Sequence, residues 1–238
     1  MVHARVNAVI FDMDGLLIDS ERMYTKVTND VLRPYGKQVT WDIKSQLMGR
    51  PAHDAARVLI ELTGVPLTVE QVLTQSSSGL ERAFTEVRPL PGVVKLVKHL
   101  EKHSVPMAIA TGSMKKNYLI KSAHLGHLFE PFGDKVLCGD DPRLGGKGKP
   151  DPTIFIEGAK LLGITTQEER KAVLVFEDGA PGVVAARAAG MEVVWIPDAE
   201  LVNTLGDDHG LNPSLTHESM EHFDPAQWGL PPYDDASE

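Results

Sequence analysis

Short apolar runs that end in polar side chains recur along this chain of 238 residues. The first spans Ala8 to Phe11 and leads into Asp12-Met13-Asp14-Gly15. A short apolar run bounded by a turn signal is typical of a buried strand in a parallel sheet, and ligands of open α/β sheets bind beyond the carboxyl ends of the strands. Side chains two residues apart lie on the same side of an extended chain. We therefore expect Asp12 and Asp14 to face one ligand, with a cation or a shared proton relieving their repulsion.

The chain from the end of this strand to about residue 88 has the periodicity of helices rather than of strands. Ser20 is a plausible N-cap for the first helix, and glycine and proline separate the later ones. The expected helices span residues 19–35, 41–48, 51–63 and 69–84. We predict a helical cap domain over residues 20–87, inserted into a core domain that is formed by residues 1–19 and 88–238.

After the turn-forming segment 88–92, apolar runs alternate with helical patterns. Further strands are expected at residues 105–110, 135–138, 172–176 and 193–196, and beyond Asp198 the pattern weakens. This alternation predicts right-handed crossovers and a parallel sheet that is covered by helices on both faces. The predicted fold class is therefore α/β, with a Rossmann-like parallel sheet core and a small all-helical cap domain inserted after the first strand.

Composition and charge narrow the class of protein. The net charge of −9 argues against nucleic acid or an anionic membrane surface as the main partner. No apolar run approaches the roughly 18 residues of a membrane span. The single cysteine, Cys138, excludes an internal disulfide and a cysteine zinc cluster, and we expect it to be a small buried side chain. We expect a cytoplasmic monomer.

Three of the expected strands end at residues that suit phosphate chemistry. Asp12 and Asp14 follow the first, Thr111 follows the run 105–110, and Glu177 and Asp178 follow the run 172–176. The carboxyl ends of parallel strands share one edge of a sheet. Lys149, at the start of a helix after a glycine-rich loop, would add a cation, with Lys147 as the alternative.

This combination predicts an enzyme that acts on phosphate esters. A carboxylate can attack phosphorus where a metal ion and a cation neutralise the phosphoryl oxygens. We assign Asp12 as the nucleophile that forms an aspartyl-phosphate and Asp14 as the general acid and base, which requires a raised pKa for Asp14. Thr111 would donate its hydroxyl to a phosphoryl oxygen, and Lys149 would balance the charge.

Mg²⁺ is the expected cofactor, because hard oxygen ligands and a bound phosphate favour it. The predicted protein ligands are Asp12, the backbone carbonyl of Asp14, Asp178, and Glu177 either directly or through water.

Four segments, in this order and spacing, resemble the motifs of the haloacid dehalogenase-like hydrolase superfamily. They are Asp-Met-Asp-Gly at 12–15, Ala-Thr-Gly-Ser at 110–113, Lys-Pro-Asp-Pro at 149–152 and Phe-Glu-Asp at 176–178. The resemblance implies the roles given above for Asp12, Asp14, Thr111, Lys149 and Asp178. The helical insert resembles the small cap of the phosphoglucomutase-like and sugar-phosphatase branch, which closes over the substrate.

Substrate contacts are expected at Gly15, Gly112, Ser113 and Arg50. Gly15 would allow close approach of the phosphate, and the resemblance places the loop of Arg50 over the site. Three of the site residues also have an interpretation without a role in catalysis. Gly15 could simply end the strand, Thr111 could cap the next helix, and Arg50 could be a solvated surface residue.

Within that branch, the likeness to the eukaryotic pseudouridine-5′-phosphatase family runs nearly end to end, with similar segments at 11–22, 41–45, 139–142, 175–178 and 228–233. It predicts a small phosphorylated sugar or nucleotide as the substrate, with pseudouridine 5′-phosphate as the first candidate. Glycerol-phosphate and 2-deoxyglucose-6-phosphate phosphatases share the motifs and the cap.

Other activities remain as alternatives. A β-phosphoglucomutase-like phosphomutase would use the same two acids. A phosphonatase would need a Schiff-base lysine from the cap, for which Lys26 and Lys44 are available. A non-catalytic, receiver-like phospho-acceptor module is the alternative from another class, although it needs neither a second acid nor a cap.

Overall fold

The computed structural model describes residues 4–48, 50, 52–205 and 210–234, and its core is a six-stranded parallel sheet. The strand order is β3-β2-β1-β4-β5-β6. The strands are β1 (Ala8–Phe11), β2 (Met107–Ala110), β3 (Val136–Leu137), β4 (Val173–Glu177), β5 (Glu192–Trp195) and β6 (Leu215–Thr216). The predicted parallel α/β sheet is confirmed, and β6 is an additional edge strand that the sequence pattern did not indicate.

Helices connect the strands and form the segment that follows β1. They are α1 (Glu21–Leu32), α2 (Trp41–Leu47), α3 (Ala52–Thr63), α4 (Val69–Phe84), α5 (Val93–Lys102), α6 (Lys115–Ser122), α7 (Gly126–Phe129), α8 (Thr153–Leu161), α9 (Gln167–Arg170), α10 (Ala180–Ala188) and α11 (Ala199–Leu205). The expected helix start at Pro51 lies outside the described residues. Among the described residues, no helix has both the length and the apolar character needed to cross a membrane.

Alternating side chains of the sheet bury into two separate hydrophobic clusters. Val9 and Phe11 of β1 join the cluster under α5, α6 and α7, whereas Ala8 and Ile10 join the cluster under α8, α10 and α11. Successive side chains of a strand point to opposite faces of the sheet, so a central strand that is covered on both sides buries all of them. The expectation of helices on both faces is confirmed.

The chain order places a topological switch point at β1. After β1 the chain forms β2 and β3 on one side of it, and then β4, β5 and β6 on the other. A crevice forms at such a point, outside the carboxyl ends of the strands. Asp12, Thr111 and Asp178 follow the three adjacent strands β1, β2 and β4 at this edge.

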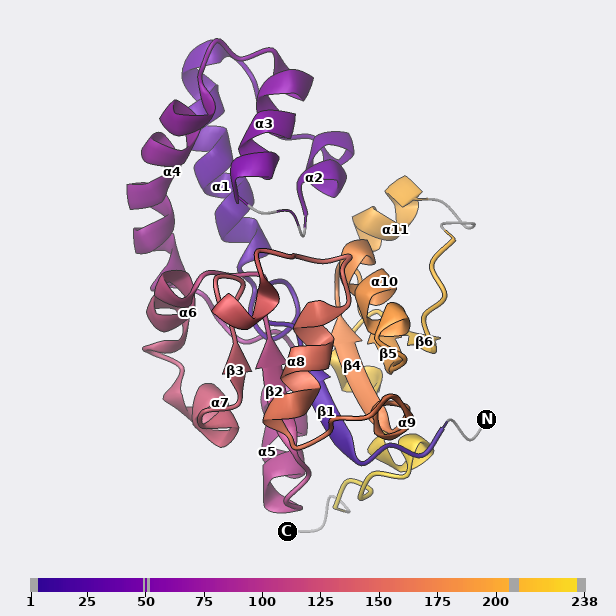
Figure 1. Ribbon diagram of the computed structural model, residues 1–238. Helices are drawn as coiled ribbons and strands as arrows, with labels where there is room; N and C mark the ends of the chain where they lie inside the picture. Colours follow the sequence, from indigo (N-terminus) through magenta and orange to yellow (C-terminus); the bar gives the residue numbers. More distant parts are fainter. Residues whose placement is uncertain (1–3, 49, 51, 206–209, 235–238) are drawn as a thin grey trace.

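Helices α1 to α4 gather at the end of the molecule toward which the strand arrows point (Figure 1). They share a hydrophobic cluster of their own, which includes Leu32, Leu59 and Val72. Two connections join this helical group to the sheet and pair with each other: Asp19 N donates to Arg88 O at 2.9 Å, and Leu90 N donates to Leu17 O at 3.2 Å. A second contact comes from α2, which packs beside α11.

Candidate active site

Lys149 binds two carboxylates at the carboxyl edge of the sheet. Its Nζ lies 2.5 Å from Asp12 Oδ1 and also pairs with Glu177 Oε1. Both acids and the lysine side chain are buried. Lys147, the alternative cation, is 59% exposed and pairs with Asp151 at 3.6 Å. The tertiary structure therefore brings Lys149, and not Lys147, to Asp12 after β1 and to Glu177 at the end of β4.

Asp12, Glu177 and Asp178 form a buried group in which one carboxylate oxygen of each residue lies within 4.8 Å of the other two. Burial raises the pKa of Asp12 to about 7; Lys149 opposes the rise, and the charges of Glu177 and Asp14 add to it. The pKa of Asp178 is raised well above its usual range by burial and then by Glu177 and Asp12. One ammonium thus faces three carboxylates, which is an excess of negative charge.

The donor set fits a hard divalent cation such as Mg²⁺. Asp178 is only 8% exposed. Within the described part of the chain, nothing donates a hydrogen bond to its carboxylate. Glu177 is less available, because Lys149 holds Oε1 and the backbone N of Gly179 donates to Oε2 at 2.8 Å. Asp12 and Asp178 are therefore the better direct ligands, and Glu177 suits a contact through water.

Two glycines allow these acids to lie against the backbone. A Cβ on Gly15 would lie 2.1 Å from Asp178 Oδ2, and Gly15 has φ +79°, which favours glycine. A Cβ on Gly182 would lie 1.8 Å from Glu177 Oε1. Gly182 is in the first turn of α10, where backbone N–H groups and the helix dipole stabilise a carboxylate. Gly182 carried no signal in the sequence beyond its place in an alanine-rich helix.

Asp14 points into a separate set of hydrogen-bond donors. Ser20 Oγ donates to Asp14 Oδ1 at 2.5 Å, Ser113 Oγ donates to Oδ2 at 2.7 Å, and the Lys121 ammonium pairs with Oδ1. Thr111 Oγ1 is 3.4 Å from Oδ2. Ser20 does occupy the N-cap position of α1, but its hydroxyl makes no capping hydrogen bond there, because it is directed to Asp14.

The expected rise in the pKa of Asp14 is wrong for this arrangement. Burial acts to raise the pKa, but the charge of Lys121 and hydrogen bonds from Lys121, Ser20 and Ser113 outweigh burial and lower it. Asp14 is therefore held as a carboxylate.

Lys121 is the site residue that sequence reasoning missed. Its side chain is 0% exposed, and its Nζ also donates to Ser113 Oγ at 2.9 Å and to Tyr24 Oη at 3.1 Å. A weak signal was present in the sequence: Lys121 lies three residues after Tyr118 on α6, and both side chains are buried. A lysine on an apolar helical stripe needs a buried partner.

The remaining predicted substrate residues differ in position. Thr111 is fully buried after β2, and its hydroxyl accepts from Ser113 N at 3.0 Å. Gly112 is exposed, with open space where a Cβ would be. Arg50 is exposed, and its Nε donates to Gln46 O at 2.6 Å within the helical segment. No hydrogen bond or ion pair joins Arg50 to the acids in the described residues, so its contact with substrate stays a prediction.

Glu21 adds a further carboxylate beside the site. A Cβ on Gly15 would lie 3.0 Å from Glu21 Cγ, which places the first turn of α1 directly over this loop. Burial raises the pKa of Glu21 to about 7. The positive charge of Lys44 opposes this rise, and the negative charge of Asp14 adds to it. Glu21 immediately follows the N-cap and was not among the predicted site residues.

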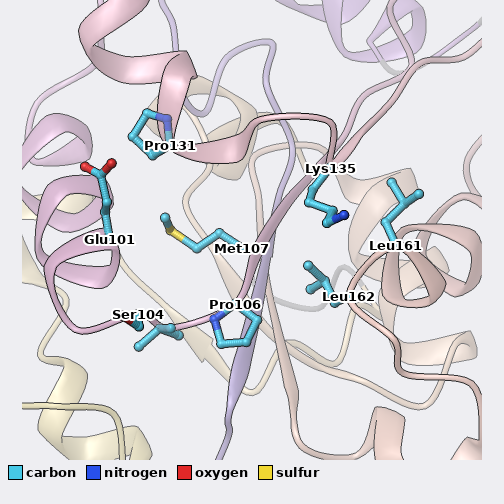
Figure 2. Close-up of a pocket in the computed structure, with 9 residues that line it drawn as sticks. Glu101, Ser104, Pro106, Met107, Pro131, Lys135, Leu161 and Leu162 are labelled. Atoms are coloured by element: carbon cyan, nitrogen blue, oxygen red, sulfur yellow. The ribbon is translucent and has the colours of Figure 1, made fainter.

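The pocket in Figure 2 lies at the other end of the sheet. Pro106 and Met107 at the start of β2 line it together with Lys135 and Leu162. Thr111 follows the opposite, carboxyl end of β2. The pocket is therefore separate from the cluster of acids.

Comparisons with known proteins agree with this geometry. The family model for "Hydrolase: haloacid dehalogenase-like hydrolase" matches residues 6–190. The chain is 38% identical to (DL)-glycerol-3-phosphatase 2 of Arabidopsis thaliana, over 98% of this chain and 95% of the relative. It is 36% identical to a probable pseudouridine-5′-phosphatase of Saccharomyces cerevisiae, over 94% of this chain and 98% of the relative.

Two solved structures have the same fold. A HAD family hydrolase of Deinococcus radiodurans R1 with bound phosphate and sodium is 25% identical, with a TM-score of 0.77 over 96% of this chain and 99% of that one. A putative β-phosphoglucomutase of Thermotoga maritima is 28% identical, with a TM-score of 0.67 over 91% of this chain and 95% of that one.

The fold and the cluster of acids define a hydrolase with a Rossmann-like parallel sheet. The chain belongs to the haloacid dehalogenase-like hydrolase family, and the family resemblance read from the four motifs is confirmed.

Proposed function

We propose that this phosphatase is a Mg²⁺-dependent phosphomonoesterase that acts on a small phosphorylated sugar or nucleotide through an aspartyl-phosphate on Asp12. The observation that carries the proposal is the placement of Asp12 at the switch point, paired with Lys149 and beside Asp178. Asp14 lies two residues away with its own donors. A nucleophile, a cation, candidate metal ligands and a second acid thus share one edge of the sheet.

In the first half-reaction, a carboxylate oxygen of Asp12 forms a bond to phosphorus and the bond from phosphorus to the ester oxygen breaks. The leaving alkoxide takes a proton from the Asp14 carboxyl group. Asp14 must be protonated for this step, and the negative charge of an arriving phosphate favours protonation of a nearby carboxylate. Lys149 balances the charge on the phosphoryl oxygens, and we assign the Thr111 hydroxyl to one of them.

In the second half-reaction, Asp14 as a carboxylate takes a proton from water as the water oxygen attacks phosphorus. The bond between phosphorus and the Asp12 oxygen breaks, inorganic phosphate leaves, and Asp12 is restored. The donors that hold Asp14 as a carboxylate suit this step.

Asp12 and Asp178 would hold Mg²⁺ directly, with the Asp14 carbonyl as a further ligand and Glu177 through water. When bound, the ion supplies positive charge that offsets the repulsion between the phosphate and the carboxylates.

We assign residues 20–87 to a cap domain that covers the substrate. Contacts of α2 with α11 and the packing of Trp41 and Met48 on the core cluster support this assignment. The two connections between the cap and the core pair with each other in antiparallel fashion, at Asp19 and Leu90. Glu21 on α1 and Arg50 between α2 and α3 are the cap residues that we expect to reach the substrate.

Pseudouridine 5′-phosphate is our first candidate substrate, and glycerol 3-phosphate is the second. Similarity over nearly the whole chain to proteins named for each activity supports both. The likeness to a putative β-phosphoglucomutase supports a phosphomutase as the second candidate activity. A mutase would need a bisphosphate activator and would release little inorganic phosphate.

The test is phosphate release with Mg²⁺ from a panel of monoesters that includes pseudouridine 5′-phosphate, glycerol 3-phosphate and 2-deoxyglucose 6-phosphate. Asp12→Asn is the inactive variant, and Asp134→Asn, at a surface position that is 87% exposed, is the matched control. We expect release from a small subset of the panel by wild type and the control, and none by Asp12→Asn. Undiminished release by Asp12→Asn would contradict the proposal. Multiple turnovers by wild type that are lost in Asp14→Asn would exclude a simple phospho-acceptor, which needs no second acid.

A further inference from the structure

Lys121 is a buried cation for which the reaction above has no use. Its side chain is 0% exposed, and an ammonium is retained in such a place only where charges and hydrogen bonds compensate for lost water. The compensating groups come from three parts of the chain: Asp14 after β1, Ser113 after β2, and Tyr24 on α1.

The contacts of Lys121 link Asp14 to both connections of the helical segment. Tyr24 is on α1, the helix that follows the first connection, and its hydroxyl accepts from Lys121 Nζ at 3.1 Å. Phe84 is the last residue of α4, before the second connection, and the Lys121 Nζ lies 4.3 Å from its ring centroid. The rings of Tyr24 and Phe84 contact each other edge-on, with centroids 5.3 Å apart.

The Lys121 ammonium also limits where the Asp14 carboxylate can point. Lys121 and Ser20 hold Oδ1, and Ser113 holds Oδ2, while Lys121 itself binds Ser113 Oγ. Both oxygens are thus held on the side of α1 and α6, whereas the Asp12 carboxylate is held by Lys149 on the side of β4. Two lysines therefore hold the two acids separately.

We propose that Lys121 is a positioning residue for the general acid and base: it fixes the Asp14 carboxylate, and Tyr24 and Phe84 fix Lys121, so that the connecting helices of the cap determine the placement of Asp14. This inference rests on the proposed function. It requires Lys121 to act through Asp14 and to leave the attack by Asp12 unaffected.

The two half-reactions separate this role from general stability. Nitrophenolate leaves p-nitrophenyl phosphate without a proton, so the first half-reaction on this ester does not need Asp14, whereas attack by water still does. Misplacement of Asp14 should therefore leave a rapid burst of one nitrophenolate per enzyme, followed by slow turnover. An alkyl monoester needs a proton on its leaving group and should show no burst.

The experiment is stopped-flow hydrolysis of p-nitrophenyl phosphate, and steady-state hydrolysis of pseudouridine 5′-phosphate or glycerol 3-phosphate, by folded Lys121→Met. We expect a burst of about one nitrophenolate per enzyme, at least as large as that of wild type, and a kcat lower by about a hundredfold, the range of general acid–base catalysis. Tyr24→Phe should change kcat in the same direction by less. Lys116→Met is the matched control, because Lys116 is on the same helix, is 70% exposed and pairs with Glu81.

A double-mutant cycle keeps the test valid if Lys121→Met alone folds poorly. In an Asp14→Asn background, adding Lys121→Met should not lower kcat further, because both changes remove one function. Wild-type kcat in Lys121→Met, an equal loss of burst and turnover in the folded variant, or a further loss in the Asp14→Asn background would overturn the positioning role. Absence of phosphate release by wild type, or a normal burst by Asp12→Asn, would instead overturn the proposed function.

Discussion

Lys149 and Asp12 are 137 residues apart in the sequence, yet Lys149 Nζ lies 2.5 Å from Asp12 Oδ1 in the interior. Both side chains are at least 90% buried, with exposures of 6% and 7%. A buried pair of this kind is costly to break, because loss of one partner leaves an uncompensated charge. The ammonium also offsets the repulsion among Asp12, Glu177 and Asp178.

Lys149→Met should therefore reduce both stability and activity. We expect a loss of about 3–5 kcal/mol in the free energy of unfolding and at least about a hundredfold in kcat. Urea unfolding and phosphate release measure the two effects. Lys147→Met, the exposed neighbour, should change neither by much, and equal behaviour of the two variants would show that Lys149 has no special role.

Gly15→Ala should damage the site more than its backbone strain alone explains. The new Cβ would lie 2.1 Å from Asp178 Oδ2, and the φ of +79° adds strain. Gly36→Ala is the matched control, because Gly36 has φ +66° and nothing within 4 Å of the Cβ position. We expect the control to lose about 1–2 kcal/mol of stability and to keep its activity. Gly15→Ala should lose more stability and most of its activity, as thermal unfolding and phosphate release would measure.

Asp178→Asn should have opposite effects on stability and catalysis. Without metal, the substitution removes one of three crowded carboxylates, so the free energy of unfolding in EDTA should rise. With metal, a ligand is lost, and the Mg²⁺ concentration for half-maximal activity should rise more than about tenfold. Treatment of wild type with EDTA should stop phosphate release, and added Mg²⁺ should restore it. A destabilised Asp178→Asn protein in EDTA would contradict the electrostatic account.

Glu21 should make the stability of the metal-free protein depend on pH. Its pKa is raised from 4.5 to about 7 in the folded state, so protons bind the folded state more tightly. The resulting stabilisation is complete below about pH 4.5 and is lost as the pH rises through 7. As the pH rises from about 4.5 to about 7, the free energy of unfolding of wild type should therefore fall by up to about 3 kcal/mol relative to that of Glu21→Gln.

Urea unfolding in EDTA at several pH values measures this difference. Glu61→Gln, at an exposed position on α3, is the control and should differ from wild type by a constant amount. A constant difference for Glu21→Gln as well would show that Glu21 titrates normally.

All of the sheet except β6, most of the helices and the acids at the edge of the sheet could be predicted from the sequence. Asp12 and Thr111 come directly after an apolar run, and Asp178 comes one residue later. The end of a strand fixes the position of the next side chain through local geometry. In a parallel sheet those ends must lie along one edge, so their proximity followed from the fold class. Lys149 was found in the same way, from the loop and helix start that precede β4.

The tertiary structure alone decided which side chains surround Asp14. Ser20 and Glu21 are at the start of α1 and Lys121 is on α6, and the direction of a helical side chain toward a site depends on how the helix packs and not on local sequence. The lowered pKa of Asp14 follows from that packing. Lys121 can be buried because residues from distant parts of the chain together replace the hydrogen bonds that water would make with its ammonium. A local sequence pattern cannot show that these partners come together.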